Sequence, residues 1–248
     1  MPFSAYVICA TPRSGSTLLC DLLAASGVAG QPHSYLRNED VGYWAHLWGV
    51  SGVKAVSNQE FNRSYLAAMI KEGMGQTGIF GLRLMWQSIS EATERLGSAF
   101  GGACEFAAQC SRTFGPTLFI HLSRKDKVAQ AVSLVRAQQT GLWHKASDGS
   151  ERERTAPPQA PIFDAARIHQ AYQSLVSDDA NWSSFFSHNG VQPVRLWYED
   201  LAIGTHAILA EILAVLGRDP MIAATISPQT AKMADATSLT WMRQLKPE

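Results

Sequence analysis

Seven residues near the N-terminus have the types and spacing needed to bind an anion. The stretch Thr11-Pro12-Arg13-Ser14-Gly15-Ser16-Thr17 separates a short apolar run from the start of a helical pattern. A strand, a turn of exposed amides and a helix N-terminus together form a cradle for phosphate. Gly15 permits close approach of the backbone, and Arg13 supplies a permanent charge and a bidentate fork. Three hydroxyl groups can donate to anion oxygens, those of Ser14, Ser16 and Thr17.

This loop differs from the usual loop for nucleoside triphosphates. That loop reads G-x-x-x-x-G-K-[ST], whereas here Arg13 stands earlier and no Lys precedes the pair Ser16-Thr17. The pattern therefore predicts a phosphate site that is not built for ATP. An ordinary strand-to-helix turn with an Arg at its mouth is the alternative interpretation.

A second candidate anion site follows another apolar run. The segment 119–124 ends at Arg124, and Ser133 stands nine residues later on a helical pattern. An ATPase would typically place an Asp at such a strand end to hold Mg²⁺. Arg124 and Ser133 can reach one further phosphate, which predicts a second anion site without a metal. The alternative is a surface Arg paired with Asp126.

The positioning elements follow from hydrophobic periodicity. Short apolar runs predict four buried parallel strands, at 5–10, 79–85, 117–122 and 192–197. Longer patterns predict six helices, at 16–25, 59–73, 88–96, 126–140, 164–189 and 206–216. The alternation predicts an α/β fold with a mostly parallel sheet flanked by helices, in which ligands bind beyond the carboxyl ends of the strands. Both anion elements lie at such ends, so we expect them to converge.

Two segments carry no such pattern. The segment 145–161 combines a charged run with three prolines and is predicted to be a flexible loop or lid. The Gly-rich segment 97–115 is predicted to meander between a helix and the third strand. We expect a single domain spanning 1–248.

Composition limits the function. The 248 residues are 46% hydrophobic and 17% charged, and 21 basic residues balance 21 acidic ones. That balance favours neither a nucleic-acid partner nor an anionic membrane surface. No apolar run is long enough to span a bilayer, and no leader is recognised, so a cytoplasmic enzyme is expected. The spacing of His and Cys predicts no metal site, and the four cysteines are expected to be buried thiols.

Five segments together carry a family resemblance. They are Thr11 to Leu19, Gly81 to Trp86, Arg124 to Ser133, Arg136 to Trp143, and Trp197-Tyr198-Glu199-Asp200-Leu201. On these residues the chain resembles sulfotransferases that use 3′-phosphoadenosine 5′-phosphosulfate (PAPS), and most of all the bacterial trehalose sulfotransferase family. The resemblance implies a three-layer P-loop-like sulfotransferase fold, a homodimer, and sulfuryl transfer to a hydroxyl of a carbohydrate or glycolipid precursor, with PAP as product.

The resemblance also implies roles for individual residues. Residues 13–17 would hold the 5′-phosphosulfate, and Arg124 with Ser133 would hold the 3′-phosphate. Arg13 would stabilise charge on the leaving phosphate electrostatically, because it is effectively always protonated. A sulfuryl group carries a single charge and needs less neutralisation than a phosphoryl group. No metal is then required.

The chain differs from the family at the residue that is expected to act as the catalytic base. In the trehalose enzymes a Glu beyond a Gly-x-Pro segment is thought to deprotonate the sugar hydroxyl. In residues 30–35 that position holds Ser34, and a second sugar-contacting Glu is replaced by Gln31. His33 is the first candidate base, since its ordinary pKa lies near neutrality; a half-exposed His in a polar loop is the alternative. Other neighbours able to act are Glu39, Asp40 and His46.

A group of aromatic and polar residues is predicted to contact the acceptor. It comprises Gln31, His33, Tyr35, Arg37, Arg83, Trp86, Trp143 and His144. Aromatic faces with polar forks suit a carbohydrate. Trp86 and Trp143 could instead be core residues. Arg83 lies within an apolar run and needs an anionic partner, either a carboxylate or the transferred sulfate.

Two other functions are compatible with these residues. One is a P-loop kinase for a small hydroxyl substrate, which the missing Lys and strand-end Asp disfavour. The other is a PAP- or PAPS-binding protein that has lost catalysis, which Ser34 favours.

Overall fold

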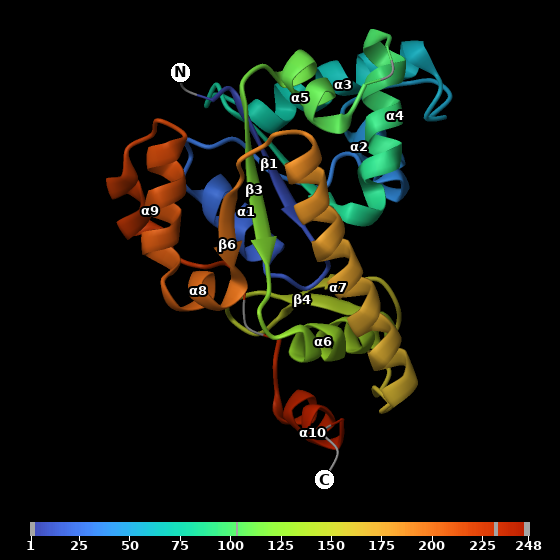
Figure 1. Cartoon of the computed structure of the whole chain (residues 1–248), viewed down its shortest axis with the longest axis vertical. Helices are drawn as coiled ribbons and strands as arrows, with labels where there is room; N and C mark the ends of the chain where they lie inside the picture. The colour runs from blue at the N-terminus through green and yellow to red at the C-terminus, as the bar shows by residue number, and fades with distance from the viewer. Residues whose placement is uncertain (1–2, 103, 231–232, 246–248) are drawn as a thin grey trace.

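A central parallel sheet organises the computed structural model, which describes residues 3–102, 104–230 and 233–245 (Figure 1). Its strands lie in the order β2-β1-β3-β6. Their bounds are β1 (Ala5–Ala10), β2 (Phe80–Met85), β3 (Thr117–Ser123) and β6 (Val194–Trp197). Each neighbouring pair is parallel, and every residue of β1 is buried. All four predicted strands are confirmed, with ends that shift by at most two residues.

Helices connect and cover these strands. They are α1 (Ser16–Ala25), α2 (Asn38–Leu47), α3 (Gln59–Met74), α4 (Ile89–Phe100), α5 (Phe106–Phe114), α6 (Lys127–Thr140), α7 (Ala165–His188), α8 (Tyr198–Ile203), α9 (Thr205–Val215) and α10 (Ala236–Gln244). Two short 3₁₀ helices, η1 (Trp86–Ser88) and η2 (Pro220–Thr225), complete the set within the described ranges. The six predicted helices are all present, and α1 has the predicted bounds.

Strand β1 divides the core into two layers because its side chains alternate between the faces of the sheet. Ala5, Val7 and Cys9 pack with aromatic residues of α7. Tyr6, Ile8 and Ala10 pack with leucines and isoleucines of α1 and α9. Helices therefore cover both faces, as the three-layer α/β prediction requires.

The segment 97–115 is helical over most of its length, so the prediction of a meander is wrong. Helix α4 continues to Phe100, and α5 occupies Phe106–Phe114. Phe106, Cys110 and Phe114 recur at every fourth position and are buried. This spacing forms one apolar helical face, but the flanking glycines obscure it in the sequence.

The predicted loop at 145–161 is also partly wrong. Residues Glu151–Arg154 form β5, which pairs antiparallel with β4 (Leu142–Lys145). We call these two strands and their turn the hairpin. No core face supports β5, and ion pairs to Asp21 and Glu151 stabilise it instead. The remaining residues up to 161 form no helix or strand.

Three of the four thiols are buried as predicted, those of Cys9, Cys20 and Cys110. Burial is the main cause that raises the pKa of the Cys20 thiol, to about 11, which leaves it protonated and unreactive. Cys104 is partly exposed, so its predicted burial is wrong. Within the described ranges, none of the helices has the length and apolar character needed to cross a membrane.

Trp182 joins helix α7 to the carboxyl end of β1. Its indole N–H donates to the carbonyl of Ala10, the last residue of β1, at 3.0 Å. We expect Trp182→Phe to keep most of the packing but to lower the free energy of unfolding by about 1–3 kcal/mol, because a buried hydrogen bond is lost. Urea unfolding measures this. Trp241→Phe on α10 is the control for lost ring area, and an equal loss in both variants would contradict the role of the hydrogen bond.

Candidate active site

The anion loop, residues 11–17, leaves the carboxyl end of β1 and enters α1. Arg13 has φ +63°, a left-handed conformation that no other described non-glycine residue adopts. Such a conformation costs about 1–2 kcal/mol and is typical of functional sites. Gly15 has φ +84°, and a Cβ there would overlap the ring of Tyr198. Backbone strain and close packing therefore fix the shape of the loop.

The interior of the loop contains a hydroxyl without a partner. Ser14 is fully buried, and its Oγ makes no hydrogen bond among the described residues. A buried polar atom left in this state costs free energy unless a ligand satisfies it. The N-terminus of α1 at Ser16 adds a positive dipole end beside it. The loop thus fits an oxygen-rich anion.

Arg13 is held in place from two sides. Its Nε donates to Oγ of Ser133 at 3.0 Å, and its Nη1 donates to the carbonyl of Trp143 at 2.5 Å. Burial first, and then the neighbouring charge of Arg124, lowers the pKa of Arg13 to about 10. The guanidinium therefore remains charged at neutral pH, in surroundings that favour an added anion.

The two predicted anion elements converge at Arg124. Its Nη1 donates to the backbone carbonyl of Arg13 at 3.4 Å, and its guanidinium lies 4.7 Å from the centroid of the Tyr198 ring. The buried Nε of Arg124 makes no hydrogen bond within the part of the chain that the structure describes. Asp126 instead caps α6 by accepting from the amide of Ala129 at 2.8 Å, so a surface Arg124–Asp126 pair is not formed.

The segment 197–201 supports Arg124. The Glu199 carboxylate accepts the backbone N–H groups of Lys125 at 3.0 Å and Asp126 at 3.1 Å. Asp200 pairs with the Lys125 ammonium at 3.0 Å. Burial opposes ionisation of Glu199, but these backbone donors and Arg124 lower its pKa. The acidic pair thus fixes the turn after β3 that presents Arg124.

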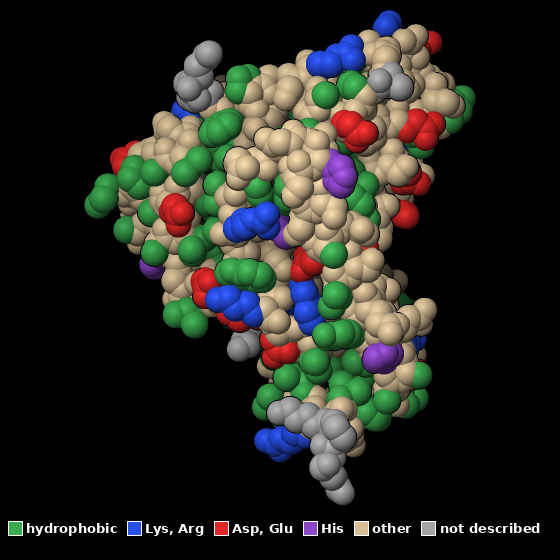
Figure 2. Space-filling view, viewed as in Figure 1, with side chains coloured by type: hydrophobic (Ala, Val, Ile, Leu, Met, Phe, Trp, Pro, Cys, Tyr) green, Lys and Arg blue, Asp and Glu red, His purple; other side chains and the backbone are tan. Residues whose placement is uncertain are grey.

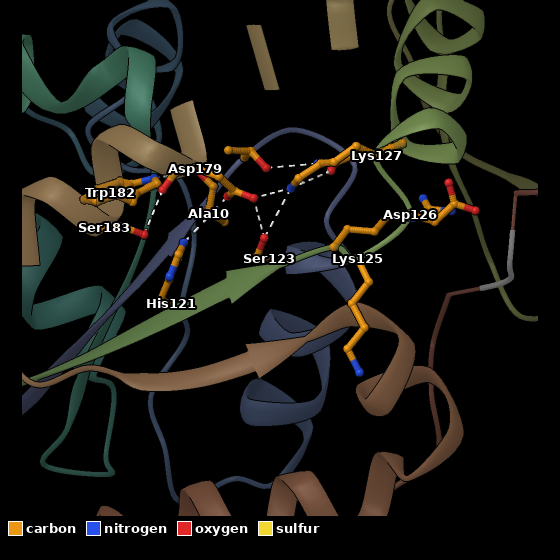
Figure 3. Close-up of polar contacts among 12 residues, drawn as sticks. Ala10, His121, Ser123, Lys125, Asp126, Lys127, Asp179, Trp182 and Ser183 are labelled. Carbon is orange, nitrogen blue, oxygen red and sulfur yellow. Dashed lines mark hydrogen bonds and ion pairs between the residues drawn. The ribbon is translucent and has the colours of Figure 1, made fainter. Parts of the chain in front are cut away.

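A chain of buried and partly buried polar groups, which we call the polar brace, joins α7 to the anion loop (Figure 3). Asp179 accepts hydrogen bonds from Lys127 and Ser123, and its Oδ1 lies 3.6 Å from Nε2 of His121. Burial would raise the pKa of Asp179, but His121, Lys127 and Ser123 outweigh it and lower the pKa. Lys127 also donates to the side chain of Gln130 at 3.2 Å.

Gln130 completes the polar brace. Its Nε2 donates to Oγ1 of Thr11 at 2.9 Å and to the carbonyl of Pro12 at 2.7 Å, and the residue is fully buried. The sequence gives no signal for Gln130 or Asp179 as site residues, because each depends on a partner far along the chain. Both are supports of the loop rather than groups that face a ligand.

A hollow opens beside the polar brace, between β6 and α7 (Figure 2). It has a volume of about 480 Å³. Charged side chains and one indole line much of it: Arg124, Lys125, Lys127, Asp179, Arg195 and Trp197. The carboxyl end of β3 is therefore open to solvent on the side of α7.

Arg83 links the anion loop to the loop at 30–35. Its Nε donates to Oγ of Ser34, and its Nη1 donates to Oγ1 of Thr17, both at 2.8 Å. No carboxylate among the described residues forms an ion pair with it. Arg83 therefore keeps the capacity for an anionic partner that its position in an apolar strand predicts.

A backbone hydrogen bond occupies the nitrogen through which His33 could act as a base. Its Nδ1 accepts the amide N–H of Ser34 at 2.9 Å, so the neutral ring carries its proton on Nε2. Partial burial and then Arg83 and Arg37 lower the pKa of His33 to about 4. His33 thus presents a hydrogen-bond donor, and its neighbour Trp44 packs edge-on at 4.7 Å.

The remaining acceptor residues divide between core and surface. Tyr35 is 4% exposed and donates its hydroxyl to the carbonyl of Gln31, so its predicted place in an acceptor wall is wrong. Trp86 packs edge-on against Trp182 at 5.1 Å, as a partly buried core residue. Arg37 is half-exposed and pairs with Asp40 at 2.6 Å.

Gln31 and Trp143 remain available to a ligand. Gln31 is exposed, and Trp143 is partly buried with its indole N–H donating to Oγ1 of Thr155 at 3.1 Å. The alternative base candidates Glu39, Asp40 and His46 lie on α2. Arg83 and His144 are the predicted acceptor residues whose side chains contact the anion loop, both through Thr17.

Gln130→Leu tests the polar brace. The change keeps an apolar side chain of similar length but leaves the Thr11 hydroxyl and the Pro12 carbonyl without their donor. We expect the free energy of unfolding to fall by about 1–3 kcal/mol, as measured by urea unfolding. Gln138→Leu, on an exposed position of the same helix, is the matched control. Equal stability of both variants would show that the polar brace contributes nothing.

Comparisons with known proteins agree with this arrangement. A family model described as Stf0 sulphotransferase matches residues 5–248. The chain is 27% identical over 264 residues to a trehalose 2-sulfotransferase of Mycobacterium tuberculosis (strain ATCC 35801 / TMC 107 / Erdman), covering 98% of this chain and 94% of that protein. It is also 27% identical over 268 residues, with the same coverage, to a trehalose 2-sulfotransferase of Mycolicibacterium smegmatis (strain ATCC 700084 / mc(2)155). With its parallel sheet and its loop at the end of β1, the chain belongs to the Stf0 sulfotransferase family.

Proposed function

We propose that this sulfotransferase moves a sulfuryl group from PAPS to a hydroxyl of a carbohydrate or glycolipid precursor. The observation that carries the proposal is the convergence of Arg13, Arg124 and Ser133 beside a loop whose buried Ser14 hydroxyl lacks a partner among the described residues. A donor with anionic groups at two positions suits such a pair of sites. Two relatives that are trehalose 2-sulfotransferases support a carbohydrate acceptor.

The residues present fit this donor. The amides and hydroxyls of residues 14–17 would hold the 5′-phosphosulfate, where Ser14 Oγ needs a partner. Arg124, whose Nε has no hydrogen-bond partner in the described chain, would hold the 3′-phosphate together with Ser133. PAPS supplies the transferable sulfuryl group.

Arg13 would stabilise the leaving phosphate by charge. In-line sulfuryl transfer gains most from positioning and from fixed charge at the leaving oxygen. Ser133 and the Trp143 carbonyl hold the guanidinium before any ligand arrives. Because its pKa of about 10 keeps it protonated at neutral pH, Arg13 acts electrostatically and not as a proton donor.

The acceptor would lie on the side of Arg83. This guanidinium spans from Ser34 to Thr17 and would orient an acceptor oxygen toward the anion loop. Exposed Gln31 and the partly buried indole of Trp143 offer further contacts to a sugar. The homodimer, the cytoplasmic location and the single domain stay predictions.

Ligand-dependent melting tests the donor. At a concentration about 100 times its Kd, PAP should raise Tm by about 5–10 °C, because it binds the folded protein only. ATP with Mg²⁺ should stabilise much less, since no Lys or strand-end Asp serves it. Equal stabilisation by both ligands, or phosphate transfer that needs Mg²⁺, would favour the kinase.

Arg13→Gly separates charge from loop geometry. Glycine adopts φ +63° without strain, so the loop should keep its shape while it loses the charge. We expect transfer of radiolabelled sulfate from PAPS to fall by about 10²–10³-fold, with trehalose, maltose, sucrose and glucose as acceptors. Arg13→Ala, which keeps the strain, is the comparison.

Three outcomes decide the proposal. Retained transfer by Arg13→Gly, within threefold of the unmodified protein, would contradict the charge role. PAP binding without transfer to any acceptor would favour the protein that has lost catalysis. Failure to bind PAP would remove the proposal altogether.

A further inference from the structure

We propose that His144 is the general base for the acceptor hydroxyl, supplied by the hairpin, with Glu153 as its positioning residue. The inference rests on the proposed function and deepens it, since Ser34 stands at the position where the family resemblance implies the base. It assigns the missing proton acceptor to a different segment of the chain.

The loop at 30–35 presents no free base. The Ser34 hydroxyl is buried and accepts from Arg83 at 2.8 Å, and a neutral hydroxyl is a poor proton acceptor. The lone pair of His33 is on Nδ1, where it accepts the fixed backbone N–H of Ser34, whereas the hydroxyl of Thr17 beside His144 can rotate away. A proton acceptor must therefore come from another element.

The hairpin brings an imidazole to the same place. Nε2 of His144 lies 3.0 Å from Oγ1 of Thr17, inside the anion loop. The side chain is 21% exposed, so it can meet an acceptor from solvent. Thr17 Oγ1 already accepts from Arg83, so its own proton is free to point at Nε2. An alcohol oxygen thus already occupies hydrogen-bond distance of this nitrogen.

The pairing of β4 with β5 fixes the orientation of His144 and places Glu153 beside it. His144 lies directly opposite Glu153, and the register shifts on both sides of this pair. Such bulges commonly re-aim a side chain next to an active site. The Glu153 carboxylate lies 3.6 Å from Nε2 of His144, where it would stabilise the imidazolium that forms when the base takes a proton.

Two further contacts fasten the hairpin to the anion loop and α1. Arg152 donates to the Asp21 carboxylate at 2.8 Å, and the Trp143 carbonyl accepts from Arg13 at 2.5 Å. These contacts flank His144 on both sides in the sequence. Its position is therefore set by the hairpin as a whole and not by the Thr17 contact alone.

The surroundings keep His144 neutral. Burial first, and then Arg13, Arg83 and Arg152, lower its pKa to about 3, while Glu153 is the facing anion. At neutral pH one ring nitrogen then carries a lone pair. An anionic donor in the loop would offset Arg13 and Arg83, which would raise the pKa of His144 and make it a stronger base when the donor is bound.

The step balances without a further reactant. The acceptor oxygen forms a bond to sulfur while the bond from sulfur to the bridging phosphate oxygen breaks. That oxygen keeps the electron pair and leaves with PAP, beside the charge of Arg13. The acceptor hydroxyl proton moves to Nε2 of His144 and later passes to solvent.

The first test is His144→Gln. We expect kcat for transfer to the best acceptor among trehalose, maltose, sucrose and glucose to fall by about 10²–10⁴-fold, while PAP stabilises the variant as it does the unmodified protein. His169→Gln, on the exposed side of α7, is the control. A kcat of His144→Gln within threefold of the unmodified protein would overturn the proposal.

Glu153→Gln tests positioning through the pH profile. Removal of the carboxylate should lower the pKa of His144, so the acid limb of kcat should move to lower pH as kcat falls. A purely structural role would lower kcat without moving the limb. An unmoved limb would remove Glu153 from the proposal.

Histidine NMR gives a readout without any acceptor. The ring signal of His144, assigned by its loss in His144→Gln, should titrate at higher pH when PAP is bound. PAP binding without such a shift would overturn the base assignment and leave the proposed function standing. Absence of PAP binding would overturn both.

Discussion

The anion loop depends on the polar brace of Asp179, Lys127 and Gln130. Backbone amides that face a ligand cannot form hydrogen bonds within the loop. The other polar groups of the loop therefore need partners elsewhere in the protein. Gln130 gives that support to Thr11 and Pro12, and Lys127 couples it to Asp179 on α7. Because the Lys127–Asp179 pair is partly buried, removal of one partner would leave the other charge incompletely compensated. The same Asp179 also binds Ser123, so one carboxylate orders both the loop and the end of β3.

Local charge governs the site although the chain has no net charge. Arg124 lies close enough to Arg13 to disfavour the charge of Arg13, and Arg83 approaches the same loop through Thr17. Like charges held together by packing raise the free energy of the ligand-free site. An anion bound between them would relieve this repulsion and would satisfy Ser14. Under the proposed function, affinity for the donor would arise from repulsion and unpaired groups that the fold maintains.

Sequence patterns predicted the strands, the helices and the anion loop, which depend on neighbouring residues. They missed contacts between residues far apart in the sequence. An apolar run predicted β1 with the bounds that the structure has. The small polar residues after it predicted the loop. Gln130 gave no signal because its partner Thr11 is 119 positions away. The charged run of β5 resembled a loop because ion pairs and β4, rather than a core, support it. Tyr35 is predicted to contact the acceptor, because residue type alone does not say which face a ring occupies. His144 was placed near the acceptor, but its contact with Thr17 depends on the hairpin.

The long-range closure of the anion loop has a consequence for biosynthesis. The loop is made first, yet the groups that hold it and the preceding Ala10 come later in the chain: Gln130, Ser133, Trp143, Trp182 and Tyr198. Trp182 is 172 positions from the carbonyl that it binds. A nascent chain therefore carries the segment around Arg13 without its partners until residue 198 has left the ribosome. Such non-local closure is slow, so a ligand that needs the closed loop could stabilise only chains that extend past residue 198.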